Sequence, residues 1–303
     1  MNHKTAILTG AAGFSGAVLT EHLREHGVEV YAVVRPGSEH NRRLSSDDPG
    51  LHILELSTEE YASLPERVGK SCDAFYHLLW TGDPYVEGQK KNVRITLQAM
   101  EAAKACGCRR FLCTGSHAEY GIVPPDELTD EKRVPMPITP YGAAKTAACH
   151  LSRIRAKELG LEWIWGRIFS LIGKYEPKGR MLPDLFCALK HGQEIRLSSC
   201  RQNWDYLDVH DAAEAIIALM ERGHDGEAYN IAKGDYQPLK NFTEELREIL
   251  RGGDLIRYGN DPEPFISLQP SAQKLKNDTG WMSKRTFAES IQDYETNDSG
   301  GWK

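Results

Sequence analysis

TAILTGAAGFSG, residues 5–16, places Gly10, Gly13 and Gly16 between a short apolar run and a helical pattern. A buried strand, a tight turn and a helix are expected in that order. Glycine suits the turn because a backbone without Cβ bends sharply and lets a pyrophosphate approach the N–H groups at the start of the helix. The stretch therefore predicts a dinucleotide-binding loop in which these glycines, Phe14 and Ser15 contact the cofactor.

A glycine-rich turn can open any buried helix, so the residues that follow are needed to tell a dinucleotide-binding loop from another turn of this kind. Leu19 and Leu23 repeat at helical spacing, Gly27 comes after them, and a second apolar run covers residues 28–34. Strand, helix and strand then fit within the roughly thirty residues of a βαβ unit.

The end of the second strand indicates which dinucleotide is bound. The chain reads VVRPGS there, with Arg35 where an acidic residue would favour NAD. A guanidinium favours a 2′-phosphate instead, so Arg35, with Ser38 and Arg42 or Arg43, predicts NADP(H). A solvated surface arginine, with NAD(H) as the cofactor, is the alternative.

The amino-acid composition limits the class of protein to which this chain can belong. The 303 residues are 40% hydrophobic and 26% charged, which is ordinary for a globular enzyme. The net charge of −6 argues against nucleic acid as a partner. No apolar run reaches the roughly twenty residues of a membrane span. The N-terminus has no signal-peptide pattern, and an odd count of cysteines without a CxxC pair fits reduced thiols, so we expect a cytoplasmic protein without a membrane partner.

Strand-like and helical runs alternate up to residue 172, which predicts an α/β, Rossmann-like, doubly wound parallel sheet. The further expected strands cover 51–56, 73–80, 109–115 and 161–169, and the expected crossover helices cover 16–26, 86–106 and 141–159. The last two helices are rich in alanine, and we expect them to pair with a second copy in a homodimer.

The pattern changes after Gly173. Residues 173–186 contain prolines and glycines and are expected to form a loop, and helices are expected at 211–222, 240–251 and 284–294. We predict a dinucleotide-binding domain over 1–172, to which 204–235 returns. A smaller, interleaved C-terminal substrate lobe would then comprise 173–203 and 236–303.

Tyr141 and Lys145 are four residues apart at the start of an expected helix, so their side chains share one face. A neighbouring cation stabilises a phenolate, so a desolvated Lys145 together with a bound nicotinamide is expected to lower the pKa of Tyr141 from its reference of about 10. Tyr141 is then suited to exchange a proton with a hydroxyl or carbonyl group.

The YxxxK spacing also occurs at Tyr229 with Lys233 and at Tyr236 with Lys240. The first pair lies on an expected strand, where residues four apart are far from each other, and the second contains Pro238 in an expected turn. Position therefore favours Tyr141.

Ser116 lies just beyond the expected strand 109–115, at the sheet edge where open α/β folds bind ligands. Ser116, Tyr141 and Lys145, after a glycine loop, resemble the short-chain dehydrogenase/reductase superfamily, in particular its extended branch, which acts on nucleotide sugars. TGAAGFSG, DAFYHLLW, GSHAEYG, PYGAAK, GRIFSLIG and WDYLDVHDAAEA match that branch in order. The resemblance implies that Ser116 orients the substrate carbonyl, that Tyr141 is the acid/base, and that Lys145 and Asn92 bind the cofactor.

Departures from that branch bear on the reaction. Ala118 stands where its dehydratases and decarboxylases carry an acid, so neither elimination nor decarboxylation is expected. Glu119, one residue further, is expected to face away from the site. His117 is a candidate second proton carrier or substrate contact, or else a packed loop histidine.

Two more departures concern the substrate. Ser170 stands where many relatives have an asparagine, and Trp204 where many have an arginine on the substrate diphosphate. Arg180, Arg196 or Arg201 is then expected to supply the missing cation, while Trp204 stacks on a base or sugar.

These features predict an NADP(H)-dependent oxidoreductase that reduces a 4-keto nucleotide sugar with Tyr141 as general acid. A nucleotide-sugar 4-epimerase with bound NAD(P) and a catalytically silent NADP(H)-binding regulator are the alternatives. His22, Glu25 and His26 also match an HxxEH zinc pattern, but no third ligand is evident and no metal is expected.

Overall fold

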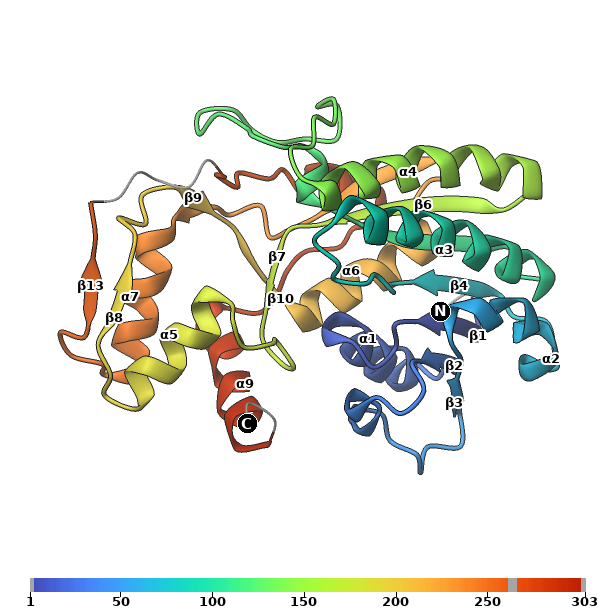
Figure 1. The fold of residues 1–303 in the computed structure, drawn as a ribbon, viewed down its shortest axis with the longest axis horizontal. Helices are drawn as coiled ribbons and strands as arrows, with labels where there is room; N and C mark the ends of the chain where they lie inside the picture. The colour runs from blue at the N-terminus through green and yellow to red at the C-terminus, as the bar shows by residue number, and fades with distance from the viewer. Residues whose placement is uncertain (1–2, 261–265, 301–303) are drawn as a thin grey trace.

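The computed structural model describes residues 3–260 and 266–300, and its centre is a parallel sheet (Figure 1). The seven strands lie in the order β3 (Leu51–Glu55), β2 (Glu29–Val34), β1 (Thr5–Thr9), β4 (Ala74–His77), β5 (Arg110–Ser116), β6 (Glu162–Ile168) and β11 (Glu227–Ile231). Every neighbouring pair is parallel. The order reverses between β1 and β4, as in a doubly wound sheet, and the predicted fold class is confirmed.

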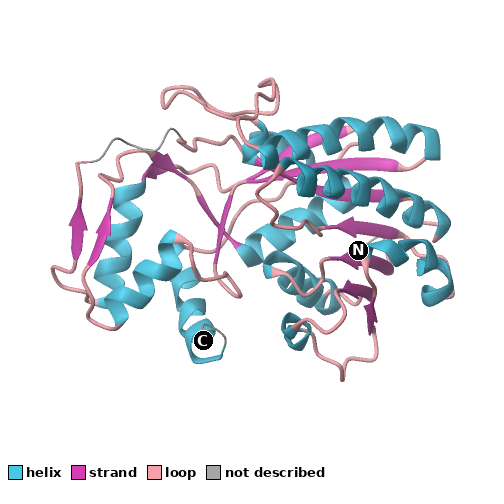
Figure 2. Ribbon diagram, in the orientation of Figure 1, coloured by secondary structure: helices cyan, strands magenta, loops and turns pink. Residues whose placement is uncertain are grey.

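Helices cover both faces of the sheet, as Figures 1 and 2 show. Strand β1 explains why: Ala6 and Leu8 enter one apolar core, and Ile7 between them enters the other. The first core is closed by α1 (Phe14–Glu25) and α6 (Val209–Arg222), the second by α3 (Val86–Ala105) and α4 (Pro140–Leu159). The smaller helices are α2 (Leu64–Val68) and α8 (Gln273–Thr279), with 3-10 turns η1 (Glu39–Arg43), η2 (Thr58–Ser63) and η3 (His117–Glu119). No helix in the described ranges combines the length and apolarity needed to cross a bilayer.

A second group of elements lies beside the carboxyl ends of the strands and has its own apolar core (Figure 1). Its helices are α5 (Met181–Lys190), α7 (Leu239–Leu250) and α9 (Phe287–Gly300). Its short strand pairs are β7 (Ser170–Ile172) with β10 (Tyr206–Asp208), β8 (Ile195–Leu197) with β13 (Ile256–Tyr258), and β9 (Asn203–Trp204) with β12 (Gln237–Pro238).

The structure differs from the sequence prediction at two places here. Residues 206–208 pair with β7 in a separate small sheet. Helix α6 packs on the main sheet, and strand β11 joins it. The expected loop at 173–186 gives way to α5 at Met181. Pro183 is compatible with that helix because it occupies the first turn, where a missing N–H costs no intrahelical hydrogen bond.

Candidate active site

The glycine loop is shaped by close contacts of its own backbone. Gly10 has φ +75°, and a Cβ on Gly16 would lie 2.1 Å from the Gly10 carbonyl oxygen. The N-cap of α1 is Gly13, which has no side chain to cap the helix, and the first turn carries no acidic residue. The positive end of this helix therefore fits an anion such as a pyrophosphate.

Arginines gather next to this loop, after β2. Arg35 is exposed, and the pKa of His40 is lowered first by burial and then by the positive charges of Arg43, Arg35 and Arg42, which lie on the same segment after β2. Arg43 also donates to the Ala12 carbonyl at 3.2 Å, which ties this segment to the glycine loop. Ser38 is the N-cap of η1 in the same segment. The group fits a 2′-phosphate.

Ser116, Tyr141 and Lys145 meet in one cavity of about 640 Å³ at the carboxyl ends of the strands. Ser116 ends β5, and the other two lie on the first turns of α4, which Thr139 caps by accepting from the Gly142 N–H at 3.1 Å. The cavity is lined by Phe14, Ser15, Leu78, Trp80, Thr114, Gly115, Ser116, His117, Tyr141, Lys145, Ile168, Phe169, Ser170, Leu171, Glu176, Arg180, Met181, Leu182, Trp204 and Tyr206. Tertiary structure thus joins the start of α1 to the three predicted catalytic residues.

Lys145 is buried, and its ammonium has two partners. Its Nζ donates to the Thr114 carbonyl at 2.7 Å and lies 3.7 Å from the centroid of the Trp80 ring. Burial lowers the pKa of Lys145 to about 8, so it is still mostly protonated at pH 7. Sequence reasoning missed Trp80, although its place at the end of the expected strand 73–80 was a usable signal.

The protein's own groups do not lower the pKa of Tyr141. Desolvation by the surrounding protein raises it, and a hydrogen bond with the Ser116 hydroxyl only partly opposes the rise. Lys145 does not reverse this because its Nζ lies 5.9 Å from the Tyr141 ring centroid and binds Thr114 instead. Tyr141 is therefore a protonated phenol at neutral pH, which suits it to donate a proton.

A buried polar network holds the turn that presents Ser116. Glu119 is fully buried; it accepts from the Ser116 N–H at 2.9 Å, from Trp165 Nε1 at 2.8 Å and from Arg167 Nε at 2.8 Å. Arg167 Nη1 also donates to the Tyr120 hydroxyl at 3.0 Å. Glu119 thus faces the interior, away from the cavity, and supports Ser116 from behind.

The two residues between Ser116 and Glu119 lie in η3. His117 lines the cavity, packs against Phe169, and has its pKa lowered to about 4 by burial, so it is neutral at pH 7. Ala118 donates its N–H to Ser116 Oγ at 3.2 Å.

Asn92 is placed differently from the predicted cofactor contact. It is buried on α3, where its Oδ1 accepts from the Thr81 N–H at 3.0 Å and its Nδ2 donates to the Thr81 carbonyl at 3.0 Å. On the same helix, Gln89 accepts from Trp80 Nε1 at 2.9 Å. Asn92 therefore fixes the segment that places Trp80 on Lys145 and does not line the cavity.

Four of the six residues predicted as substrate contacts line the cavity: His117, Ser170, Arg180 and Trp204. Arg196 and Arg201 are exposed and lie outside it, which corrects that prediction. Arg196 points to solvent because its strand neighbours, Ile195 and Leu197, pack on the lobe core. Sequence reasoning missed Glu176, which also lines the cavity.

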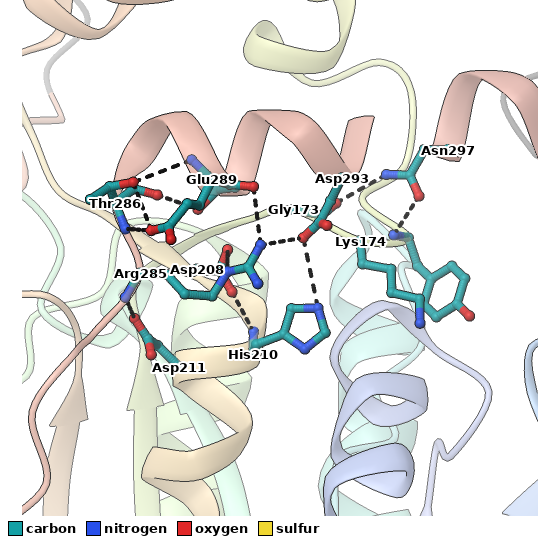
Figure 3. A network of polar contacts seen from close by, with 12 residues as sticks. Gly173, Lys174, Asp208, His210, Asp211, Arg285, Thr286, Glu289, Asp293 and Asn297 are labelled. Carbon is teal, nitrogen blue, oxygen red and sulfur yellow. Dashed lines mark hydrogen bonds and ion pairs between the residues drawn. The ribbon is translucent and has the colours of Figure 1, made fainter. Parts of the chain in front are cut away.

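The HxxEH pattern does not form a metal site. His22 and His26 both contact Glu214, and His22 Nε2 lies 2.9 Å from His210 Nδ1. Figure 3 shows His210 in turn directed at Asp293, with Arg285 between Asp208 and Asp293. Within the described ranges no three His, Cys, Asp or Glu side chains are arranged to hold a metal.

The fold and the cavity together define a dinucleotide-binding α/β protein of the extended short-chain dehydrogenase/reductase type. A model of the NAD-dependent epimerase/dehydratase family matches residues 6–232. The chain belongs to that family and is an enzyme of it. The resemblance found in the sequence is thereby confirmed.

Individual relatives catalyse different reactions. UDP-glucose 4-epimerase of Streptomyces lividans is 25% identical over 95% of this chain and 94% of that protein. GDP-6-deoxy-D-mannose reductase of Pseudomonas aeruginosa is 26% identical over 66% of this chain and 70% of that protein. The crystal structure of dTDP-glucose 4,6-dehydratase from Bacillus anthracis in complex with NAD superposes with a TM-score of 0.87 at 19% identity, covering 98% of each chain.

Proposed function

We propose that this enzyme is an NADP(H)-dependent reductase of a 4-keto, nucleotide-activated sugar. The observation that carries the proposal is the single cavity in which Ser15 at the start of α1 lies together with Ser116, Tyr141 and Lys145. A nicotinamide bound there supplies or accepts a hydride. The residues do the rest: Tyr141 donates the proton to the carbonyl oxygen, and the Ser116 hydroxyl steadies the charge that develops on it.

Two features favour reduction over epimerisation. The arginine group after β2 fits the 2′-phosphate of NADPH, the dinucleotide that cells generally keep for reductions. The raised pKa of Tyr141 keeps its proton in place for donation. In this proposal Lys145, which Thr114 and Trp80 hold in the cavity, binds the nicotinamide ribose.

The test is to incubate the purified enzyme with NADPH and a panel of 4-keto hexose nucleotides. We expect stoichiometric NADPH oxidation and a reduced sugar nucleotide. Interconversion of two sugar epimers without net oxidation, on a cofactor that stays bound, would instead make the enzyme a 4-epimerase. Cofactor binding without turnover on the whole panel would favour the silent regulator.

Arg35→Asp tests the cofactor assignment. We expect NADPH binding to weaken about 10- to 100-fold, because a charge-assisted contact with the 2′-phosphate contributes roughly 1.5–3 kcal/mol. NADH binding should change little. Fluorescence titration of both cofactors measures this, with Arg67→Asp, at an exposed position on α2, as the control. Equal losses for both cofactors would show that Arg35 does not contact the phosphate.

The homodimer stays a prediction. It is supported by Leu151 and Ile154, two apolar residues exposed one turn apart on α4. Apolar side chains so placed fit a helix face that packs against a second copy.

A further inference from the structure

The loop that carries Glu176 is held in an unusual backbone conformation. Gly173 has φ +117° and Tyr175, a residue with a side chain, has φ +67°. A non-glycine residue with positive φ is uncommon and persists where surrounding contacts impose it. The backbone between β7 and α5 is therefore bent so that residue 176 turns inward.

Helix α9 supplies those contacts, as Figure 3 shows around Asn297. The Asn297 amide donates to the Gly173 carbonyl at 3.1 Å and accepts from the Tyr175 N–H at 2.9 Å. On the outer side of the loop, Lys174 donates to both carboxylate oxygens of Glu21 on α1. The loop is thus clamped from two helices.

The clamped loop directs a carboxyl group into the cavity. Glu176 is 3% exposed and lines the cavity with Arg180 and Trp204. The Tyr294 hydroxyl on α9 donates to Glu176 Oε2, and Arg180 Nη1 lies 3.9 Å from Oε1. Burial raises the pKa of Glu176 to about 7, although Tyr294 and Arg180 oppose the rise.

The residues that line this end of the cavity favour some ligand groups over others, according to whether those groups donate or accept hydrogen bonds. The Arg180 guanidinium lines the cavity and is a donor, whereas the indole N–H of Trp204 is itself buried, so Trp204 offers the ligand its ring. Above its pKa of about 7, the Glu176 carboxylate accepts up to about four hydrogen bonds and repels phosphate. A ligand that fits both residues must present oxygen acceptors to Arg180 and hydrogen-bond donors to Glu176.

We propose that Glu176 is a specificity-determining residue that binds hydroxyl groups of the substrate sugar, while Arg180 faces its phosphate side. The inference rests on the proposed function, since it takes the ligand to be a nucleotide sugar. The inference adds a requirement on the sugar, which must carry at least one hydroxyl group that reaches Glu176. A sugar that lacks this hydroxyl group is expected to bind less tightly.

The experiment compares matched ligand pairs by isothermal titration calorimetry on the NADP(H)-loaded enzyme: UDP with UDP-glucose, dTDP with dTDP-glucose, and GDP with GDP-mannose. The measured quantity is the ratio of the affinity for the sugar nucleotide to that for the bare diphosphate. Glu176→Ala should lower this ratio about 10- to 100-fold, as expected for loss of hydrogen bonds to a charged acceptor. Glu176→Gln, which keeps the shape, should lower it by less.

Glu194→Gln is the control, because Glu194 lies outside the cavity lining and pairs with the exposed side chain of Arg257 on the surface of this lobe. The ratio of the two affinities in this control variant should stay at the wild-type value. An unchanged ratio in Glu176→Gln and Glu176→Ala, or equal weakening of both ligands in each pair, would overturn the inference. If Glu176→Ala does not fold, the Gln variant decides by the same criterion. Failure of the wild-type enzyme to bind any sugar nucleotide would instead overturn the proposed function, and the inference with it.

Discussion

Tyr141→Phe should lower kcat for the carbonyl reduction by about 10²–10⁴-fold, the usual contribution of general acid catalysis, and leave NADPH affinity unchanged. The phenol oxygen is the proton donor in the proposed step, whereas phenylalanine keeps the ring that packs edge-on against Trp80 at 6.1 Å. Because the pKa of Tyr141 is raised above its ordinary value, the wild-type phenol stays protonated through neutral pH. Single-turnover kinetics with saturating NADPH measures the chemical step directly.

Tyr236→Phe is the matched control. Tyr236 and Lys240 repeat the YxxxK spacing, and Tyr236 is about as exposed as Tyr141, but it lies outside the cavity lining. Its loss should leave kcat at the wild-type value. If Tyr141→Phe reduces the substrate at the wild-type rate, another group donates the proton, and the acid assignment fails. Equilibrium binding of NADPH to both variants separates a loss of chemistry from a loss of cofactor.

Arg167→Met should destabilise the folded enzyme by roughly 3–5 kcal/mol, the range seen when one partner of a buried ion pair is removed. Arg167 is 5% exposed and Glu119 is fully buried, so the substitution leaves a carboxylate in the interior without its guanidinium. The ion pair with Glu119 keeps the pKa of Arg167 above its usual value despite burial, so the guanidinium is charged at all ordinary pH values. Urea unfolding followed by circular dichroism should show a lower midpoint.

Arg257→Met provides the comparison at an exposed ion pair, where Arg257 Nε lies 2.9 Å from Glu194. Water solvates both of those charges, so the midpoint should hardly move. The double variant Glu119→Leu, Arg167→Met should recover part of the stability lost in Arg167→Met, because no buried charge is then left unpaired. A midpoint for Arg167→Met equal to that of Arg257→Met would mean that the buried network does not hold the Ser116 turn.

Local patterns predicted the dinucleotide-binding half well. Alternation of apolar residues, glycine turns and helical spacing identified every strand of the main sheet, because both faces of that sheet are buried. The order of Ser116, Tyr141 and Lys145 along the chain also sufficed to bring them into one cavity. In a parallel sheet the carboxyl ends of the strands meet at the same edge, so positions at strand ends translate into proximity.

The substrate side was predicted less well. Of Arg180, Arg196 and Arg201, only the first lines the cavity, and nothing in the local pattern separates them. Glu176 was not predicted at all, because its inward direction depends on Asn297 and Tyr294 more than a hundred residues later. The protein's own groups do not lower the pKa of Tyr141, because helical spacing places Lys145 on the same face but does not determine which partner its ammonium selects.

By itself, the sequence determined the parallel α/β fold, the glycine loop and the three catalytic candidates, since these follow from contacts between residues near in the chain and from the regular geometry of a parallel sheet. Only the tertiary structure decided the protonation of Tyr141, the support of Ser116 by Glu119 and Arg167, and the entry of Glu176 into the cavity. Burial and charge at these groups are set by side chains from distant segments packed together, and a linear pattern does not encode which of those side chains meet.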